Sequence, residues 1–166
     1  MRTVLISKVG DSESIAAVAE LAHDIWTEHY VPIIGPDQVD YMLRNIQSET
    51  AIRHQITNER FHYYLITRDC SSIGYIGVQD QGDVLLLSKV YVRASARGSG
   101  LGKQALEFVR SLAAERGHRR IRLTVNINNE LAIGAYERLG FSRTGTQVAD
   151  IGGGFVMDDY VYEMSV

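Results

Sequence analysis

The sequence has little cysteine, little proline and no long hydrophobic run. Its single cysteine, Cys70, excludes an internal disulfide and a zinc site built on cysteines. No apolar stretch approaches the roughly 20 residues that a membrane-spanning helix needs, and the first residues lack the apolar segment and cleavage site of a signal peptide. The formal net charge of −3 removes any global electrostatic argument for nucleic-acid binding. We therefore expect a cytoplasmic protein without nucleic-acid or membrane partners.

The chain does contain enough apolar material for a packed core. Of its 166 residues, 45% are hydrophobic and 22% are charged, which are ordinary values for a globular protein. A length of about 100–200 residues is typical of one domain. Because we find no repeat, no low-complexity segment and no linker, residues 1–166 are expected to form a single domain.

Hydrophobic periodicity predicts helices and strands in a mixed order. Strands are expected at 3–8, 62–67, 72–80, 84–92, 120–125, 141–148 and 155–164. A first helix, capped by Asp11 and Ser12, should be broken by the segment 30–36, which holds both prolines, Pro32 and Pro36. Further helices are expected from Pro36, over 48–56, from a glycine-rich turn to Gly117, and over 130–139. Without the short helix at 48–56 the order is β-α-α-β-β-β-α-β-α-β-β, for which one mixed sheet with helices on its faces is the simplest α/β (α+β) architecture.

A glycine-rich turn from Arg97 to Lys103 joins the buried strand 84–92 to a long helix. Glycines at alternate positions let the backbone approach a ligand closely, and the free amides at a helix start favour phosphate. The spacing fits neither a dinucleotide fingerprint nor a Walker A loop, since Gln104 follows the lysine. The turn predicts a pyrophosphate site, and a connector without a ligand is the alternative.

Two motifs together resemble the GNAT superfamily of acetyl-CoA-dependent N-acetyltransferases. The first, Q/R-x-x-G-x-G/A, is matched in full by Arg97-Gly98-Ser99-Gly100-Leu101-Gly102. The second, N-x-x-A-x-x-x-Y-x-x-x-G-F, is complete as Asn129, Ala132, Tyr136, Gly140 and Phe141. The resemblance implies one mixed, mostly antiparallel sheet with helices on both faces, over essentially the whole chain. The segments 41–43 and 150–160 are also similar to a bacterial branch that includes PaiA-type polyamine acetyltransferases.

The five histidines show no metal-ligand spacing, so no metal is expected. The resemblance implies acetyl-CoA as cosubstrate and a set of residue roles. The residues expected along the pantetheine arm are Val90, Tyr91, Val92 and Asn129, with an oxyanion-stabilising amide near Val90 or Val92. Those expected on the pyrophosphate are Arg97, Gly98, Ser99, Gly100, Leu101, Gly102 and Lys103. Tyr136 would protonate the departing thiolate. The alternative roles are a helix N-cap for Asn129 and a core aromatic for Tyr136.

The glutamate that some family members use as a general base is missing. Leu86, eleven residues before Arg97, stands in its place. An amine with a pKa near 10.4 is only about 1 part in 2,000 neutral at pH 7, so a group or a water must accept its proton. The side chains that could accept this proton are Glu28, His29, Asp150 and Asp158, and the sequence does not choose among them. We take Glu28 as the candidate general base.

These features predict an acyltransferase in which a primary amine attacks acetyl-CoA directly. Residues 10–49 carry a net charge of −7 and residues 144–166 carry −4, against +6 in residues 93–122. This polarity favours a small cationic acceptor such as a polyamine. The alternatives are an acyl-CoA-binding regulatory module without turnover and a protein N-terminal or lysine acetyltransferase. A homodimer is expected by analogy with the superfamily.

Overall fold

The computed structural model describes residues 3–166, and Met1 and Arg2, which begin the segment tested for a signal peptide, lie outside them. The elements in chain order are β1 (Val4–Lys8), α1 (Ser12–Ile34), α2 (Pro36–Asn45), α3 (Glu49–Asn58), β2 (Phe61–Arg68), β3 (Ser71–Gln81), β4 (Val84–Val92), the 3₁₀ turn η1 (Ala94–Ala96), α4 (Leu101–Glu115), β5 (Arg120–Asn126), α5 (Glu130–Arg138), β6 (Ser142–Gly152) and β7 (Phe155–Ser165). The predicted order is confirmed, with the short helix at 48–56 present as α3. None of the described helices is both long and apolar enough to cross a membrane.

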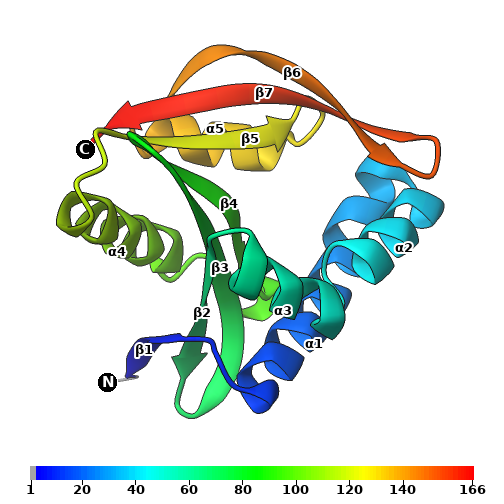
Figure 1. The fold of residues 1–166 in the computed structure, drawn as a ribbon, viewed down its shortest axis with the longest axis horizontal. Coiled ribbons are helices and arrows are strands. Elements are labelled where there is room, and N and C mark those ends of the chain that lie inside the picture. The colour runs from blue at the N-terminus through cyan, green and yellow to red at the C-terminus, as the bar shows by residue number, and fades with distance from the viewer. Residues whose placement is uncertain (1–2) are drawn as a thin grey trace.

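All seven strands form one sheet in the order β1-β2-β3-β4-β5-β7-β6. Only β4 and β5 are parallel, and every other neighbouring pair is antiparallel. The β4–β5 pairing covers only Val84–Leu86 against 120–122. Beyond Leu86 the two strands diverge, so that β5, β7 and β6 turn away from the rest of the sheet (Figure 1).

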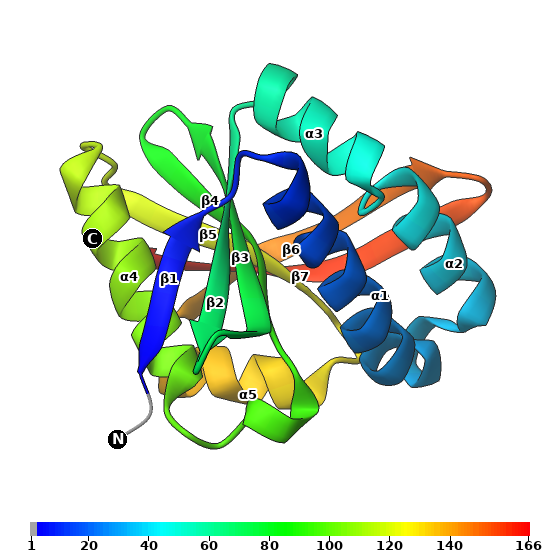
Figure 2. The same cartoon turned by 90° about the horizontal axis from the view of Figure 1, so that it is seen from below.

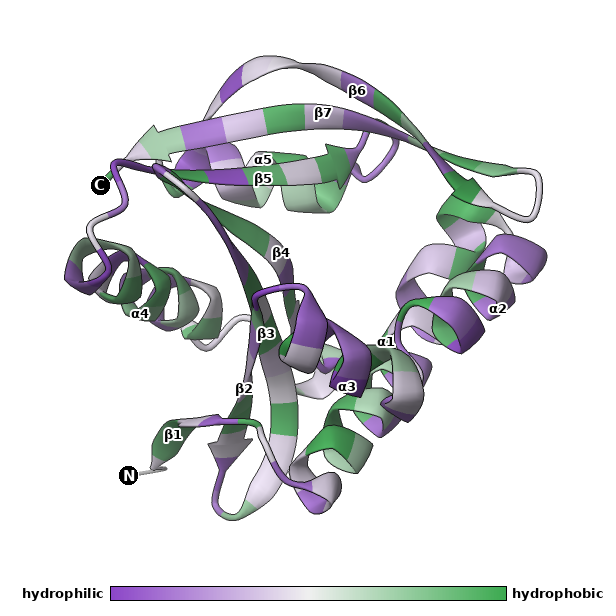
Figure 3. Cartoon of the chain, in the orientation of Figure 1, coloured by the Kyte–Doolittle hydropathy of each residue, from purple (hydrophilic) through white to green (hydrophobic). Residues whose placement is uncertain are grey.

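The helices cover both faces of this sheet, as the sequence predicts (Figure 2). One apolar cluster joins α4 to the sheet, where α4 buries Leu101, Ala105 and Val109. The other cluster joins α1, α2 and α3 to the opposite face, with Val18 and Trp26 of α1 among its members. Both α1 and α4 carry hydrophobic and hydrophilic residues, the pattern of helices with one buried side (Figure 3).

The expected break of the first helix within residues 30–36 is confirmed, but it falls at Gly35 and not at the first proline. The helix α1 continues through Pro32 and ends at Ile34, before Gly35, which has φ +87°. Proline removes one amide from the helix, but the next turn closes because the Gly35 N–H donates to the Val31 carbonyl at 3.0 Å. Val31 and Ile34 also pack on the apolar cluster. Tertiary packing thus maintains the last turn.

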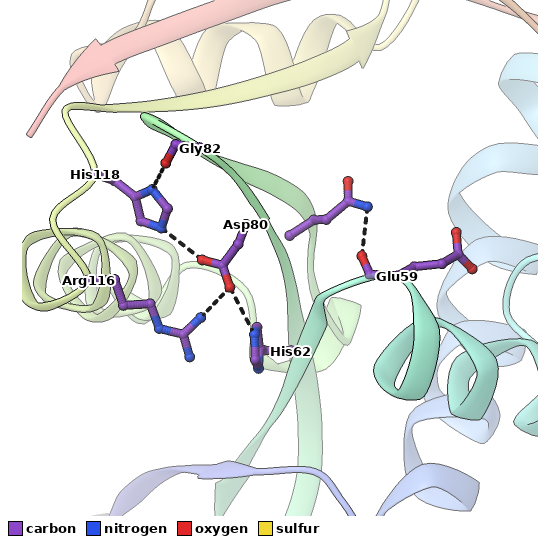
Figure 4. Close-up of polar contacts among 7 residues, drawn as sticks. Glu59, His62, Asp80, Gly82, Arg116 and His118 are labelled. Atoms are coloured by element: carbon purple, nitrogen blue, oxygen red, sulfur yellow. Dashed lines mark hydrogen bonds and ion pairs between the residues drawn. The ribbon is translucent and has the colours of Figure 1, made fainter.

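A cluster of four charged or titratable side chains links the end of β3 and the start of β2 to the segment that follows α4 (Figure 4). The Asp80 carboxylate accepts from His118 Nε2 at 2.8 Å, Arg116 at 3.0 Å and His62 Nε2 at 3.0 Å. His118 Nδ1 faces the Gly82 carbonyl at 2.9 Å. None of these residues lines the cavity described below, so we assign the cluster to stability.

Replacing Asp80 with asparagine is expected to destabilise the protein by about 2–3 kcal/mol at pH 7, since charge-assisted hydrogen bonds each contribute roughly 1.5–3 kcal/mol. Partial burial of Asp80 opposes ionisation, but its bonds to His118, Arg116 and His62 outweigh this and lower its pKa. The carboxylate's contribution is therefore complete above about pH 4 and is lost as the pH falls through the depressed folded-state pKa. Urea melts at pH 7 and pH 3.5 should show a difference from wild type that shrinks at the lower pH. An equal difference at both values would contradict this account.

Candidate active site

The divergence of β4 and β5 opens a cavity of about 510 Å³ beside the glycine turn. In the β3–β4 register Gly77 pairs with Lys89 and Val78 with Leu87, so Ser88 bulges from the ladder. From Leu87 onward β4 pairs with β3 alone, and its other edge faces the cavity. An open strand edge carries backbone donors and acceptors that an extended ligand can use. This geometry suits an amide-containing arm such as pantetheine.

Most of the predicted cofactor residues line this single cavity. The ones that do are Val90, Tyr91, Val92, Arg97, Gly98, Gly100, Leu101, Gly102, Asn129 and Tyr136. Ser99 and Lys103 do not line it; Lys103 is exposed and the Ser99 hydroxyl donates to the Ala96 carbonyl at 2.8 Å. Two motifs about 30 residues apart in the sequence therefore meet at one site.

The glycine turn presents free backbone amides at the start of α4. Gly98 and Gly100 have φ of +81° and +78°, in the left-handed region that favours glycine. Gly100 is the N-cap, and no side chain caps the helix. The first amides of α4 are thus free for an anion. A Cβ at Gly98, Gly100 or Gly102 would meet nothing within 4 Å, so there is open space beside the backbone for a ligand.

Asn129 links the start of α5 to α1. Its Oδ1 accepts from the Ala132 amide at 3.4 Å, which confirms the N-cap prediction, and it lies 3.2 Å from His29 Nε2. Because this oxygen is an acceptor, His29 Nε2 donates and Nδ1 carries the lone pair of a neutral ring. Burial, joined by the nearby Arg97, lowers the pKa of His29, which favours that neutral form.

Three tyrosines converge at the inner wall of the cavity. The Tyr30 and Tyr91 hydroxyls are 3.1 Å apart, and Tyr136 is close enough to Tyr30 to interact electrostatically with it. Burial first, and Tyr30 second, raise the pKa of Tyr136, so its proton is retained at neutral pH. The Tyr136 ring packs edge-on against Phe141 at 5.8 Å. Its packing matches the core-aromatic alternative, while its place in the cavity wall matches the proton-donor prediction.

The carboxylates proposed as bases from the sequence do not line the cavity. Glu28, Asp150 and Asp158 are all exposed. Of the basic residues in segment 93–122, Arg93 pairs with Asp24 at 2.9 Å and others pair elsewhere, which offsets part of the charge polarity. The charged side chains that do line the cavity are Arg97 and Arg138.

Two buried titratable groups beside the cavity were not predicted. Lys89 Nζ donates to Ser88 Oγ at 2.9 Å and lies over the Phe61 ring, and burial lowers its pKa to about 8. Asp159 on β7 is only 4% exposed. Strand alternation offers a signal for both, since each is a charged residue on a strand face that is otherwise apolar.

The helix α2 contacts the tip of the β6–β7 hairpin. This contact brings the segments 41–43 and 150–160 together. The Tyr41 hydroxyl donates to the Ile151 carbonyl at 2.8 Å. A Cβ on Gly153 would lie 2.6 Å from the Tyr41 ring, so the hairpin backbone approaches α2 too closely for any side chain there. This contact positions the hairpin over the α1–α2 side of the sheet.

The comparisons with known proteins agree with this fold and site. An α/β protein with a splayed mixed sheet and a phosphate-type turn at a helix start is the class that the geometry defines. The model of the acetyltransferase (GNAT) family matches residues 18–141, and the chain belongs to that family.

Solved acetyltransferase structures share the fold along nearly the whole chain. The PaiA N-acetyltransferase of Thermoplasma acidophilum, in complex with coenzyme A, has a TM-score of 0.80 at 19% identity, covering 99% of each chain. The ribosomal-protein-S18-alanine N-acetyltransferase of Escherichia coli has a TM-score of 0.72 at 19% identity, covering 99% of this chain and 94% of that one. These likenesses show a common fold.

Curated relatives match over shorter segments. A Bacillus subtilis protein assigned as a ribosomal protein bS18-alanine N-acetyltransferase is 28% identical over 90 residues, which are 54% of this chain and 60% of the relative. The 5-NmdU N-acetyltransferase of Pseudomonas phage PaMx11 is 43% identical over 61 residues, 37% of this chain and 41% of the relative. The chain thus spans about half the length of the curated relatives it matches.

Proposed function

We propose that this chain is an N-acetyltransferase that moves the acetyl group of acetyl-CoA to a primary amine by direct attack. The observation that carries the proposal is the 510 Å³ cavity, which joins the open edge of β4, the free amides at the start of α4 and the hydroxyl of Tyr136. Membership of an acetyltransferase family supports it. No metal is required for this chemistry.

Each wall of the cavity supplies one part of the reaction in this proposal. The turn from Arg97 to Gly102 holds the pyrophosphate, and the open edge of β4 with Asn129 holds the pantetheine arm. A backbone amide near Val90 or Val92 stabilises the oxyanion, an effect of roughly 3–4 kcal/mol where such donors are preorganised. Tyr136 protonates the departing thiolate. The amine nitrogen forms its bond to the carbonyl carbon as the carbon–sulfur bond breaks.

The test is a thiol-release assay with a panel of acceptors. Small cationic amines such as spermidine are the first class, neutral and anionic primary amines the second, and peptides with a free N-terminal alanine the third. Turnover on any class supports the proposal. Binding of CoA without turnover on all three would replace it with an acyl-CoA-binding module.

Within the amines, we propose a cationic acceptor. The support is the acidic α1–α2 segment, with a net charge of −7 over residues 10–49, which flanks the face of the sheet where the hairpin docks. Electrostatic capture of this kind weakens with salt. The specificity constant for spermidine should therefore fall by about tenfold or more as the Debye length drops from about 30 to 8 Å. A neutral primary amine is the control, and an equal salt response for both would exclude steering.

The second candidate is a protein N-terminal acetyltransferase. It is favoured by two relatives whose names specify ribosomal protein alanine N-acetylation. The peptide arm of the panel separates it from a small-amine enzyme, since the two differ in acceptor and share the chemistry.

A further inference from the structure

Asp159 is a buried carboxylate without a counter-charge. It is 4% exposed, and its Oδ1 has no hydrogen-bond partner among the described residues. No ion pair found within residues 3–166 includes it. Burying an unpaired carboxylate is costly, because the charged form loses its hydration without a compensating partner. Such a group calls for an explanation in terms of what it binds or accepts.

Asp159 lies next to the cavity wall. In the β5–β7 register Asp159 is opposite Asn126, and Thr124 is opposite Val161. Residues two apart on a strand share a face, so Thr124 and Asp159 are diagonal neighbours on one face of the sheet, within reach of one another. The Thr124 hydroxyl interacts with the Asp159 carboxylate, and Thr124 itself lines the cavity.

This part of the wall is the end of the cavity remote from the glycine turn. Leu87 and Ser88 line it from β4 and Thr124 lines it from β5. At about 3.3 Å per residue, Ser88 lies roughly 13 Å along β4 from Val92, the last residue of that strand. A cosubstrate anchored by its pyrophosphate at the turn would therefore direct its other end toward Thr124.

We propose that Asp159 is the final proton acceptor for the amine, reached through the Thr124 hydroxyl. The inference rests on the proposed acetyltransferase function. The proton balance is complete without any further reactant. An ammonium N–H bond breaks and its proton goes to Thr124 Oγ, while the Thr124 hydroxyl proton goes to Asp159. The neutral amine then attacks, and Tyr136 gives its proton to sulfur as the carbon–sulfur bond breaks. The second proton lost by nitrogen restores the Tyr136 phenolate to a hydroxyl, and Asp159 releases its proton to solvent.

The surroundings of Asp159 suit a group that changes its protonation. The charged or titratable groups that interact with it electrostatically are Tyr30 on α1 and Asp158 on the opposite face of its own strand. Its partners across β5 and β6 are the neutral Asn126 and Gln147. Burial, followed by Asp158, raises the pKa of Asp159 to about 6. It is thus ionised and able to accept a proton at pH 7 and above.

The test compares Asp159→Asn with Asp158→Asn, a matched variant that removes the same charge one residue away on the exposed face of β7. For wild type, kcat/KM should fall as the pH drops below about 6. Asp159→Asn should lower kcat/KM by about 10²-fold or more at pH 7.5 and abolish this acid limb. Asp158→Asn should retain the rate at pH 7.5 within about twofold and keep an acid limb, which moves to lower pH because Asp158 contributes to the raised pKa of Asp159. Thermal melts of Asp159→Asn at pH 7.5 should be no lower than wild type, because the variant removes an unpaired buried charge.

A second pair of variants tests the relay. Thr124→Ser keeps the hydroxyl and should retain most of the rate, whereas Thr124→Val keeps the shape and should match Asp159→Asn. An acid limb that persists in Asp159→Asn overturns the inference, and its loss in His29→Gln instead would assign the proton to His29. Those results leave the acetyltransferase proposal intact. Wild-type CoA binding without turnover on any acceptor would overturn both.

Discussion

Replacing Tyr136 with phenylalanine is expected to lower kcat by about 10²- to 10⁴-fold, the usual range for loss of a general acid. The ring stays in place against Phe141, since its packing at 5.8 Å involves no hydroxyl. Among the described residues the Tyr136 hydroxyl has no hydrogen-bond partner of its own, so the substitution leaves no partner unsatisfied. The affinity for CoA should be nearly unchanged. Steady-state kinetics with the best acceptor, together with calorimetry for CoA, measure both quantities.

Tyr160→Phe is the matched control for this variant. Tyr160 is a half-buried tyrosine on β7 whose ring stacks with Arg143, and it lies outside the cavity. Its substitution should leave kcat within about twofold, the scale expected of a change outside the site. Wild-type turnover in Tyr136→Phe would contradict the proton-donor role and leave Tyr136 as a core aromatic.

Local signals in the sequence accounted for most of the fold. Asp11 and Ser48 cap α1 and α3 through their side chains, as short polar residues before an apolar period do. The helix α4 was predicted to stop near Gly117, and it ends at Glu115, two residues before that glycine, which has a positive φ. The glycine turn and the Asn129 motif likewise located the cavity, because both depend on residue types at fixed spacing along the chain.

Features that depend on packing were not predictable in this way. The rule that proline ends a helix failed at Pro32, where contacts of Val31 and Ile34 with the apolar cluster hold the last turn. The sequence also did not single out Asp159, which we propose as the proton acceptor. Strand alternation marks both Asp158 and Asp159 as charged positions on β7, and these neighbours face opposite sides. Burial in the folded sheet shows which faces inward, since Asp159 is 4% exposed and Asp158 is exposed.

Replacing Gly100 with aspartate is expected to weaken CoA binding by tenfold or more, which corresponds to about 1.4 kcal/mol. Gly100 is the N-cap of α4, with a φ of +78°, and a Cβ there meets nothing within 4 Å. The fold should tolerate the change, because aspartate is among the residues that enter the left-handed region most readily. The added carboxylate would stand beside the free amides that we propose hold the pyrophosphate, where it repels the phosphates. Calorimetric titration with CoA gives the affinity.

Gly100→Asn separates charge from bulk at this position, since asparagine has the same shape and the same tolerance for a positive φ. If the turn binds phosphate, aspartate should weaken CoA binding more than asparagine does. The difference should shrink as salt rises from 0.01 to 0.15 M, because the Debye length falls from about 30 to 8 Å. The loss caused by asparagine alone, being steric, should not depend on salt. An equal, salt-independent loss in both variants would mean that the turn limits access without contacting phosphate, and unchanged affinity in both would remove the turn from the CoA site.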